Sequence, residues 1–230
     1  MADTMATMSS SAALRCCLWA GLAAALAGPA RADSGWKTIV VEDGIKVTER
    51  KVPGQVFPTF RGVGDVNASI YDVLAVVSDI KRHTQWVESC IASRVVERKG
   101  WRQYVVYSRT NVPWPISDRD AVYRSHVKVN AKRTEVTIVF KAIRGKVPRV
   151  SGVVRMVNLR GHFKFKKLGE HKTRIDYQVD ADPGGWIPKW LARLATRKMP
   201  LSTIQGMRKR VKATKGWYHK RIKQWKAGKF

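Results

Sequence analysis

A single stretch decides the fold class: TRIDYQVDAD at residues 173–182, followed by PGGWIP at residues 183–188 and then by a long basic segment. Its apolar members Ile175, Tyr177 and Val179 alternate with polar residues. Successive side chains of a strand point to opposite faces, so this alternation predicts a strand with one apolar and one wet face. Beyond Pro188, apolar residues recur at steps of three and four, which predicts a long helix able to cover such a face.

The same alternation recurs along most of the chain, interrupted by turn residues such as Asp43-Gly44. A helix is expected over residues 68–79, capped by Asn67, and Pro200 is expected to kink or restart the C-terminal helix. This order of elements predicts an α+β fold in which a curved antiparallel sheet wraps around the long C-terminal helix. The expected strands cover residues 36–41, 45–48, 57–66, 91–97, 102–109, 121–129, 135–143, 153–157, 162–167 and 173–182.

The N-terminal residues predict export. A basic residue precedes the apolar run at residues 16–27, and the triplet Ala30-Arg31-Ala32 follows it. This arrangement is typical of a signal peptide, which we place at residues 1–32. Cleavage near Ala32 predicts a periplasmic or secreted protein, and the alternative is a run kept as an anchor. After cleavage, Cys90 is the only cysteine left, so no intramolecular disulfide can form.

The charge of the chain points to an anionic partner. Its 44 Lys and Arg outnumber its 17 Asp and Glu, which gives a formal net charge of +27. Residues 183–230 contain no acidic residue and 14 basic ones. Export argues against nucleic acid, which remains the expected partner only if the signal peptide is wrong. We therefore expect an anionic membrane surface as partner, and a monomeric protein.

No pattern in the sequence predicts a metal, a cofactor or a catalytic residue. The histidines lack metal-binding spacing, and neither a nucleophile elbow nor a phosphate-binding loop is found. Gly62-Val63-Gly64 lacks the third glycine of a dinucleotide fingerprint, which favours close backbone packing instead. Asp118 and Asp120 flank Arg119, a pattern more typical of structural ion pairs than of acid chemistry.

Three segments of the chain resemble the START domains, the steroidogenic-acute-regulatory-related lipid-transfer domains of the helix-grip superfamily. They are FRGVG at residues 60–64, leading through a helix to Trp86; VPWPISDRD at residues 112–120; and DADPGGWIP at residues 180–188. The resemblance covers roughly residues 36–211. It implies a START-like lipid-binding domain at residues 33–212, followed by a basic amphipathic extension at residues 213–230 that is not part of the family pattern.

The resemblance also implies an internal apolar cavity, between the sheet and the C-terminal helix, that holds a lipid or sterol-like molecule. The alternation of apolar residues alone favours a solid core over a cavity, because most apolar faces pack against other apolar side chains without leaving a space. An arginine inside the cavity would need an acidic partner or an anionic ligand. The residues expected to line the cavity are Arg61, Tyr104, Ser108, Tyr123, Val136, Ile138, Phe140, Phe163, Phe165, Tyr177, Ile204 and Met207.

These features predict an exported START-type protein that binds and transfers a hydrophobic ligand without covalent chemistry. One alternative is a helix-grip enzyme, a cyclase or hydrolase acting in the same cavity. It would require an inward-facing pair such as a histidine near a carboxylate. His126 and His162 fall on the outward phase of their strands, which argues against it. Another alternative is a basic protein whose tail binds membrane surfaces while the cavity plays no part.

The basic tail, residues 208–229, is expected to dock on anionic membranes, because its Lys and Arg residues are interspersed with Trp and Tyr, which favour the bilayer interface. The residues expected to make this contact are Arg208, Lys209, Arg210, Lys212, Trp217, Lys220, Arg221 and Trp225. The proline-rich loop at residues 112–120 is expected to be stiff, with Trp114 anchored against the body. Its two acids are expected to pair with Arg61 or Arg119.

Overall fold

The computed structural model describes residues 35–55 and 57–227, without the side chains of residues 189–197. The predicted signal peptide, residues 1–32, lies outside the described residues. None of the helices in the described part combines the length and apolar character needed to cross a bilayer.

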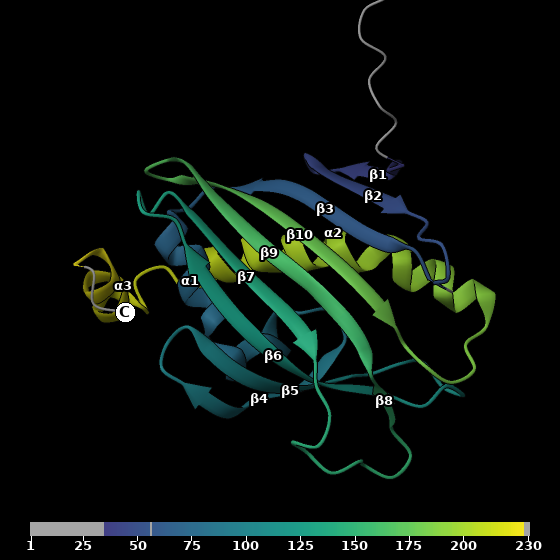
Figure 1. Cartoon of the computed structure of the whole chain (residues 1–230). Coiled ribbons are helices and arrows are strands. Elements are labelled where there is room, and N and C mark those ends of the chain that lie inside the picture. The colour runs from purple at the N-terminus through teal and green to yellow at the C-terminus, as the bar shows by residue number, and fades with distance from the viewer. Residues whose placement is uncertain (1–34, 56, 228–230) are drawn as a thin grey trace, which may run out of the picture. The chain divides into compact units, whose positions relative to one another are not determined.

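Ten strands of the described chain form one strongly curved sheet (Figure 1). Their order is β1-β2-β3-β10-β9-β7-β6-β5-β4, and neighbours along it are antiparallel. The short β8 lies off this path and pairs in parallel with β6. The strands are β1 (Lys37–Glu42), β2 (Ile45–Arg50), β3 (Thr59–Val66), β4 (Cys90–Lys99), β5 (Gln103–Thr110), β6 (Arg119–Val129), β7 (Glu135–Ala142), β8 (Val154–Met156), β9 (Asn158–Gly169) and β10 (Lys172–Asp182).

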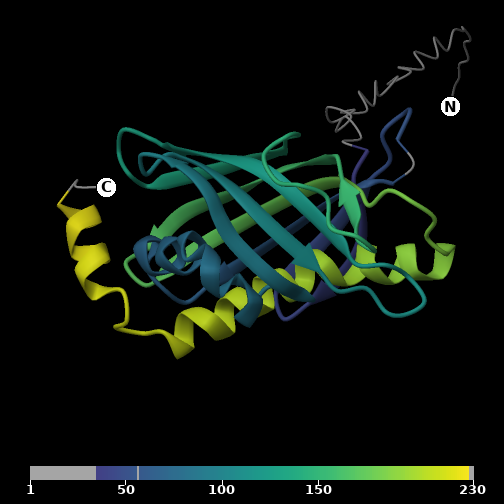
Figure 2. The same cartoon turned by 90° about the horizontal axis from the view of Figure 1, so that it is seen from below.

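The helices gather on the concave face of the sheet. The long helix α2 (Lys189–Ala213) runs along this face, and α1 (Ile70–Ser78) and the 3₁₀-helix η1 (Ile80–Gln85) lie beside its C-terminal part (Figures 1 and 2). The main hydrophobic core lies between these helices and the sheet. This is the α+β helix-grip arrangement that the alternating strands and the closing helix predicted.

Two helix boundaries differ from the expectation. Helix α1 is capped by Ser69, whose hydroxyl accepts a hydrogen bond from the Asp72 amide at 3.2 Å, and not by Asn67. Pro200 does not end α2, which is one continuous helix through this residue. The tail, in contrast, is not a continuation of α2. The chain turns at Gly216, where φ is +85°, and starts a separate helix α3 (His219–Lys226).

Helix α2 approaches β3 closely because two glycines of β3 face it. A Cβ atom at Gly62 would lie 2.9 Å from Cβ of Pro200, and one at Gly64 would lie 2.9 Å from Cγ1 of Ile45 and 3.4 Å from Ile204. Real Cβ atoms do not come this close to other carbons, so only glycine allows the helix to rest here. The prediction of close backbone packing at Gly62-Val63-Gly64 is confirmed.

A third glycine sets the contact of α2 with η1. A Cβ atom at Gly206 would lie 2.1 Å from the carbonyl oxygen of Trp86, the residue that ends η1. The Trp86 side chain is itself buried in the core. The helix is therefore held at two places along its length, by β3 on one side and by the end of η1 on the other.

We predict that Gly62→Ala lowers the free energy of unfolding by about 1–3 kcal/mol, because the added methyl group must displace the rigid ring of Pro200. Gly169→Ala is the matched control, since this strand glycine has open space around its Cβ position and no positive φ. Urea denaturation of both variants measures the difference. Equal stability of the two variants would contradict the proposed close contact.

Candidate ligand-binding site

The inner face of the sheet carries a ladder of aromatic side chains across neighbouring strands. Phe163 of β9 lies opposite Ile138 of β7 and opposite Tyr177 of β10. The rings of Phe163 and Tyr177 stack with centroids 4.2 Å apart. Phe140 and Tyr123 continue the ladder toward β6, with their centroids 5.9 Å apart. The sheet thus presents a broad aromatic surface to the space under α2.

This surface is packed solid at one end and accessible at the other. Phe165, Ile204 and Met207 are completely buried beside α1, and Val136, Ile138, Tyr104 and Tyr177 keep less than a tenth of their surface exposed. Toward the end of the sheet where α2 begins, four inner-face side chains remain partly accessible. They are Ser108, Tyr123, Phe140 and Phe163. The apolar phase of the strands therefore forms a packed core with a partly accessible region beside it, which is defined by these four residues and is called the hollow below.

Tyr123 shows that this region is enclosed by protein. Burial raises the pKa of the Tyr123 hydroxyl far above its usual range, and a hydrogen bond from Ser108 offsets only a small part of the shift. Part of the Tyr123 surface is nevertheless accessible. A tyrosine that is shielded from bulk water and keeps some accessible surface is suited to lining a ligand site.

Hydroxyl groups gather along one wall of the hollow. Ser93 of β4 is the cross-strand neighbour of Ser108 of β5, and Tyr123 lies on the next strand. The Oγ atom of Ser93 is buried and has no hydrogen-bond partner. An unpaired buried hydroxyl is costly, and a polar group of a bound molecule would satisfy it. Ser93 was missed in the sequence, where only its position opposite Ser108 in adjoining strands could have revealed it.

Arg61 does not line the hollow. Its neighbours Phe60 and Gly62 face α2, so Arg61 points to the outer face of the sheet. There its Nε donates to Asp176 Oδ1 at 2.8 Å, and the pair is partly exposed. The expectation that Arg61 contacts a ligand inside the protein is therefore wrong, because the two-residue period of the strand places it on the opposite side.

A buried arginine joins two of the sequence segments at the mouth of the hollow. Arg119 keeps only 3% of its surface exposed and donates to the carbonyl oxygen of Ser117 at 2.5 Å. It also reaches the loop before α2, donating to the carbonyl of Gly184 at 3.1 Å and to those of Pro183 and Trp186 at 3.5 Å. Arg119 therefore clamps the proline-rich loop to the loop that leads into α2.

The expected pairing of the two acids is corrected. Asp118 accepts from Arg109 Nε at 2.8 Å, and Asp120 accepts from Arg155 Nε at 2.6 Å. Neither acid pairs with Arg61 or Arg119, since the guanidinium of Arg119 is taken up by main-chain carbonyls. The partners come from β5 and β8, which the local sequence of the loop could not indicate.

The comparison with protein families decides the assignment. A family model described as START domain matches residues 22–215. The chain belongs to the START domain family. An uncharacterised protein of Pseudomonas aeruginosa is 32% identical over 195 residues, covering 85% of this chain and 95% of that protein.

Two further relatives carry names that refer to lipids. The phosphatidylcholine transfer protein of Rattus norvegicus is 26% identical over 202 residues, covering 86% of this chain and 92% of that protein. The crystal structure of a STAR-related lipid transfer protein fragment from Xanthomonas axonopodis superimposes with a TM-score of 0.71 at 29% identity. It covers 77% of this chain and 99% of that fragment. The resemblance to the START family and its helix-grip fold is confirmed.

The START domain exposes two tryptophans at its mouth. Trp114, in the proline-rich loop, is 91% exposed, and Trp186, in the loop before α2, is 75% exposed. The expectation that Trp114 anchors its loop against the body is wrong, because Arg119 performs this task through main-chain carbonyls. The clamp leaves both indole rings in solvent on loops whose positions it fixes.

The basic tail of the START domain is partly used in holding the fold together. Arg208 donates to the main-chain carbonyls of Asp65 and Asp43, both at 2.8 Å. Arg210 lies over the ring of Trp217 at 5.1 Å, and Tyr218 donates to Asp79 at 2.8 Å, which ties the start of α3 to the end of α1.

The eight tail residues expected at a membrane therefore divide into two groups. Arg208, Arg210 and Trp225 are partly buried, whereas Lys209, Lys212, Trp217, Lys220 and Arg221 are exposed. In the first group, Arg208 is held by main-chain carbonyls and Trp225 packs against the main core, so these two side chains already have partners within the domain. Membrane contact by the second group stays a prediction.

The histidines lie where the strand phase predicted them. His126 is exposed, and His162 lies on the outer face near Asp176, with Nε2 3.9 Å from the carboxylate. Among the described residues, no group of three or more His, Cys, Asp or Glu side chains has the arrangement of a metal site.

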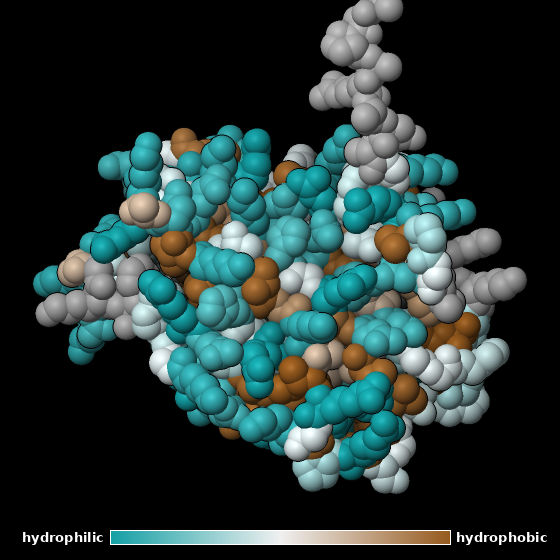
Figure 3. All heavy atoms as spheres, viewed as in Figure 1, coloured by the Kyte–Doolittle hydropathy of each residue, from teal (hydrophilic) through white to brown (hydrophobic). Residues whose placement is uncertain are grey.

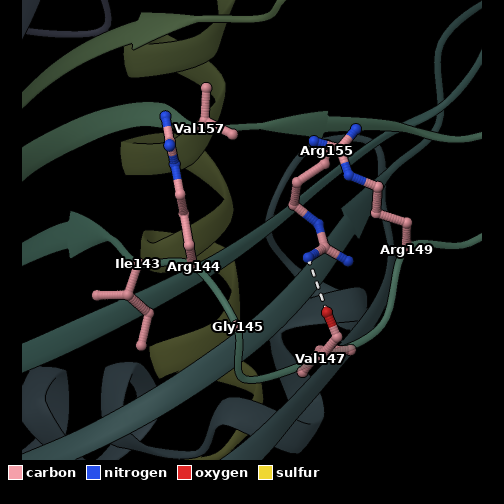
Figure 4. Close-up of a pocket in the computed structure, with 7 residues that line it drawn as sticks. All are labelled: Ile143, Arg144, Gly145, Val147, Arg149, Arg155 and Val157. Carbon is pink, nitrogen blue, oxygen red and sulfur yellow. Dashed lines mark hydrogen bonds between the residues drawn. The ribbon is translucent and has the colours of Figure 1, made fainter.

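Two surface pockets lie outside the hollow. One, of about 440 Å³, is formed by the loop between β7 and β8, where Arg144 and Arg149 flank it and Arg155 donates to the Val147 carbonyl at 3.1 Å (Figure 4). The other, of about 660 Å³, lies over β6, β7, β9 and β10 on the outer face. Ile143 borders both.

We predict that Asp120→Asn lowers the free energy of unfolding of this START domain by about 3 kcal/mol. The reason is that the change leaves Arg155, which is 9% exposed, without its carboxylate. Asp65→Asn is the matched control. It breaks a more exposed pair with Arg174 and costs less than about 1 kcal/mol. Denaturant unfolding measures both. Normal stability of Asp120→Asn would contradict the structural role assigned to this acid.

Proposed function

We propose that this protein is exported and binds a lipid or another hydrophobic molecule in the hollow between the sheet and α2, carrying it between membranes. The family and its relatives support the lipid-binding part of this proposal. The N-terminal sequence supports export to the periplasm or beyond the cell. The protein acts by non-covalent uptake and release.

The observation that carries the proposal is the combination of accessible aromatic rings with an unpaired hydroxyl in one enclosed region. Phe140, Phe163 and Tyr123 offer an apolar surface that is partly accessible, and Ser93 offers a polar atom that lacks a partner. Such a lining matches an amphiphilic molecule, whose chains pack on the rings while its polar end meets the hydroxyls. Each Å² of apolar surface removed from water contributes about 25 cal/mol to uptake.

Membrane docking at the mouth follows from the two exposed tryptophans. Indole rings favour the bilayer interface, where an apolar body and a polar edge are both accommodated. Trp114 and Trp186 are placed for this contact on loops that Arg119 holds together. A molecule leaving the hollow there would enter the bilayer without crossing water.

The exposed lysines of the tail favour an anionic surface. Each base near such a surface contributes about 1 kcal/mol, within a Debye length of about 8 Å. The tail lies at the end of α2 opposite to the tryptophan loops (Figures 1 and 2), and α2 with its 25 residues spans about 37 Å. The two contacts are therefore separate, and we propose that the protein lies lengthwise on the membrane.

We predict that Ala142→Trp reduces the amount of bound lipid at least tenfold, because Ala142 lies beside Tyr123 on the partly accessible inner face and the new ring fills the hollow. Ala131→Trp is the matched control in an exposed turn. The variants are purified from the periplasm of the native host cells, and native mass spectrometry measures the lipid that each one carries. Equal lipid occupancy of both variants, or a wild-type protein that never carries lipid, would refute the proposed site.

We predict that Trp114→Ala with Trp186→Ala slows lipid transfer between vesicles about tenfold, while lipid already bound stays bound.

We also predict that replacing Lys209, Lys212 and Lys220 by Gln weakens binding to anionic vesicles and reduces the dependence of this binding on salt. A variant with Gln at Lys51, Lys128 and Lys132 is the charge-matched control, since these lysines are exposed elsewhere on the domain. Sedimentation with anionic and zwitterionic vesicles measures the fraction of bound protein. Equal binding of the two lysine variants would show that the tail lysines do not contribute to docking.

A further inference from the structure

The outer face of the sheet carries a row of three positive charges on adjacent strands. Arg124 of β6 lies directly opposite Lys141 of β7, and Lys141 lies directly opposite Arg160 of β9. Like charges in directly opposed positions destabilise a sheet. Figure 3, which views this face, shows that hydrophilic side chains cover most of it. The row is therefore unfavourable for the fold unless something negative offsets it.

The carboxylates near the row neutralise only one end of it. Asp180 lies opposite Arg160 on β10 and accepts from its Nε at 2.7 Å. No ion pair connects Arg124 or Lys141 to a carboxylate in the described part of the chain, and Glu97 interacts with Arg124 only as a weak, unpaired charge. Two adjacent cations thus remain uncompensated in the middle of the sheet.

A second row, next to the first, adds nitrogen donors. His126 of β6 and His162 of β9 lie on either side of Val139 of β7, in positions opposite one another across the strands. The two rows line the pocket of about 660 Å³ on this face, and Val139 is the small side chain between the imidazoles. The cations and the imidazoles therefore face one concave surface and not a flat one.

We propose that this pocket is a second binding site, for an anion that carries one or more phosphate groups. Guanidinium groups bind phosphate oxygens through paired N–H donors, and the lysine between two arginines adds a third charge. Arg124, Lys141 and Arg160 would hold the phosphate, with His126 and His162 donating from the adjacent row. The sheet separates this site from the hollow under α2, since Tyr123 and Phe140 face inward while Arg124 and Lys141 face outward.

Isothermal titration calorimetry with pyrophosphate tests the proposal on the complete protein without its predicted signal peptide, residues 33–230. We expect one binding site per chain and about a tenfold loss of affinity in Lys141→Gln. Lys128→Gln is the matched control, because Lys128 lies on the same face of β6, exposed and outside the pocket. We expect its affinity to stay within twofold of the wild type.

A second measurement separates a binding role from a merely structural one. Lys141→Glu places a carboxylate between Arg124 and Arg160, so we expect it to raise the midpoint of thermal unfolding without pyrophosphate and to abolish the further rise that pyrophosphate causes in the wild type. Unchanged pyrophosphate binding in Lys141→Glu overturns the proposal. An equal loss of affinity in Lys128→Gln and Lys141→Gln also overturns it, because the anion would then respond only to the overall charge.

The phosphate can come from a soluble molecule or from a lipid headgroup, and a vesicle arm distinguishes them. Vesicles that contain phosphatidic acid are compared with inorganic phosphate and pyrophosphate in solution, using the wild type and Lys141→Gln. Loss of vesicle binding in Lys141→Gln, with the tail intact, identifies a headgroup site. Loss of pyrophosphate binding alone identifies a soluble anion. Absence of an effect of Lys141→Gln in both arms refutes the site, while the hollow under α2 remains testable by its own variants.

Discussion

The close contact between α2 and β3 is the constraint on which the rest of the domain depends. Gly62 and Gly64 let the helix rest on the strand, and Gly206 lets it rest on the end of η1. With the helix fixed at these points, the inner side chains near them pack completely, as Phe165 and Ile204 do. Farther from these contacts, Ser108, Tyr123, Phe140 and Phe163 keep part of their surface accessible.

The two faces of the sheet have different chemistry because each strand has a period of two. Inward, the strands place Phe163 and Tyr177 in a stack beside a hydroxyl wall; outward, they place Arg124 and Lys141 side by side. Arg119 is the exception, a charge on the inner side. It is tolerated because four main-chain carbonyls accept from it, and those contacts hold the entrance of the hollow in one arrangement.

The errors of prediction have two causes, the phase of a single strand and contacts between distant segments. Arg61 was expected to line the cavity as one of its few polar groups, although the phase of its own strand, read from Phe60 and Gly62, places it on the outer face. The prolines of residues 112–120 predict a stiff loop, but they do not indicate that Arg119 holds it to the loop before α2. Ser93 is recognised as a residue of the hydroxyl wall only from the register of β4 and β5, which places it opposite Ser108. Its neighbours along the chain do not indicate that it faces the hollow.

The sequence by itself determined the strands, the long closing helix, the α+β class and the positions of the glycines that bring helix and sheet together. These are local properties, set by alternation, by spacing and by the absence of a Cβ atom. Only the tertiary structure determines the hydrogen-bond and ion-pair partners of Asp118, Arg119 and Asp120. It also determines that the tail forms a separate helix on α1, and which parts of the apolar face are packed or accessible. These outcomes depend on the curvature of the sheet and on which segments meet across it, and neither is encoded in the neighbours of any one residue.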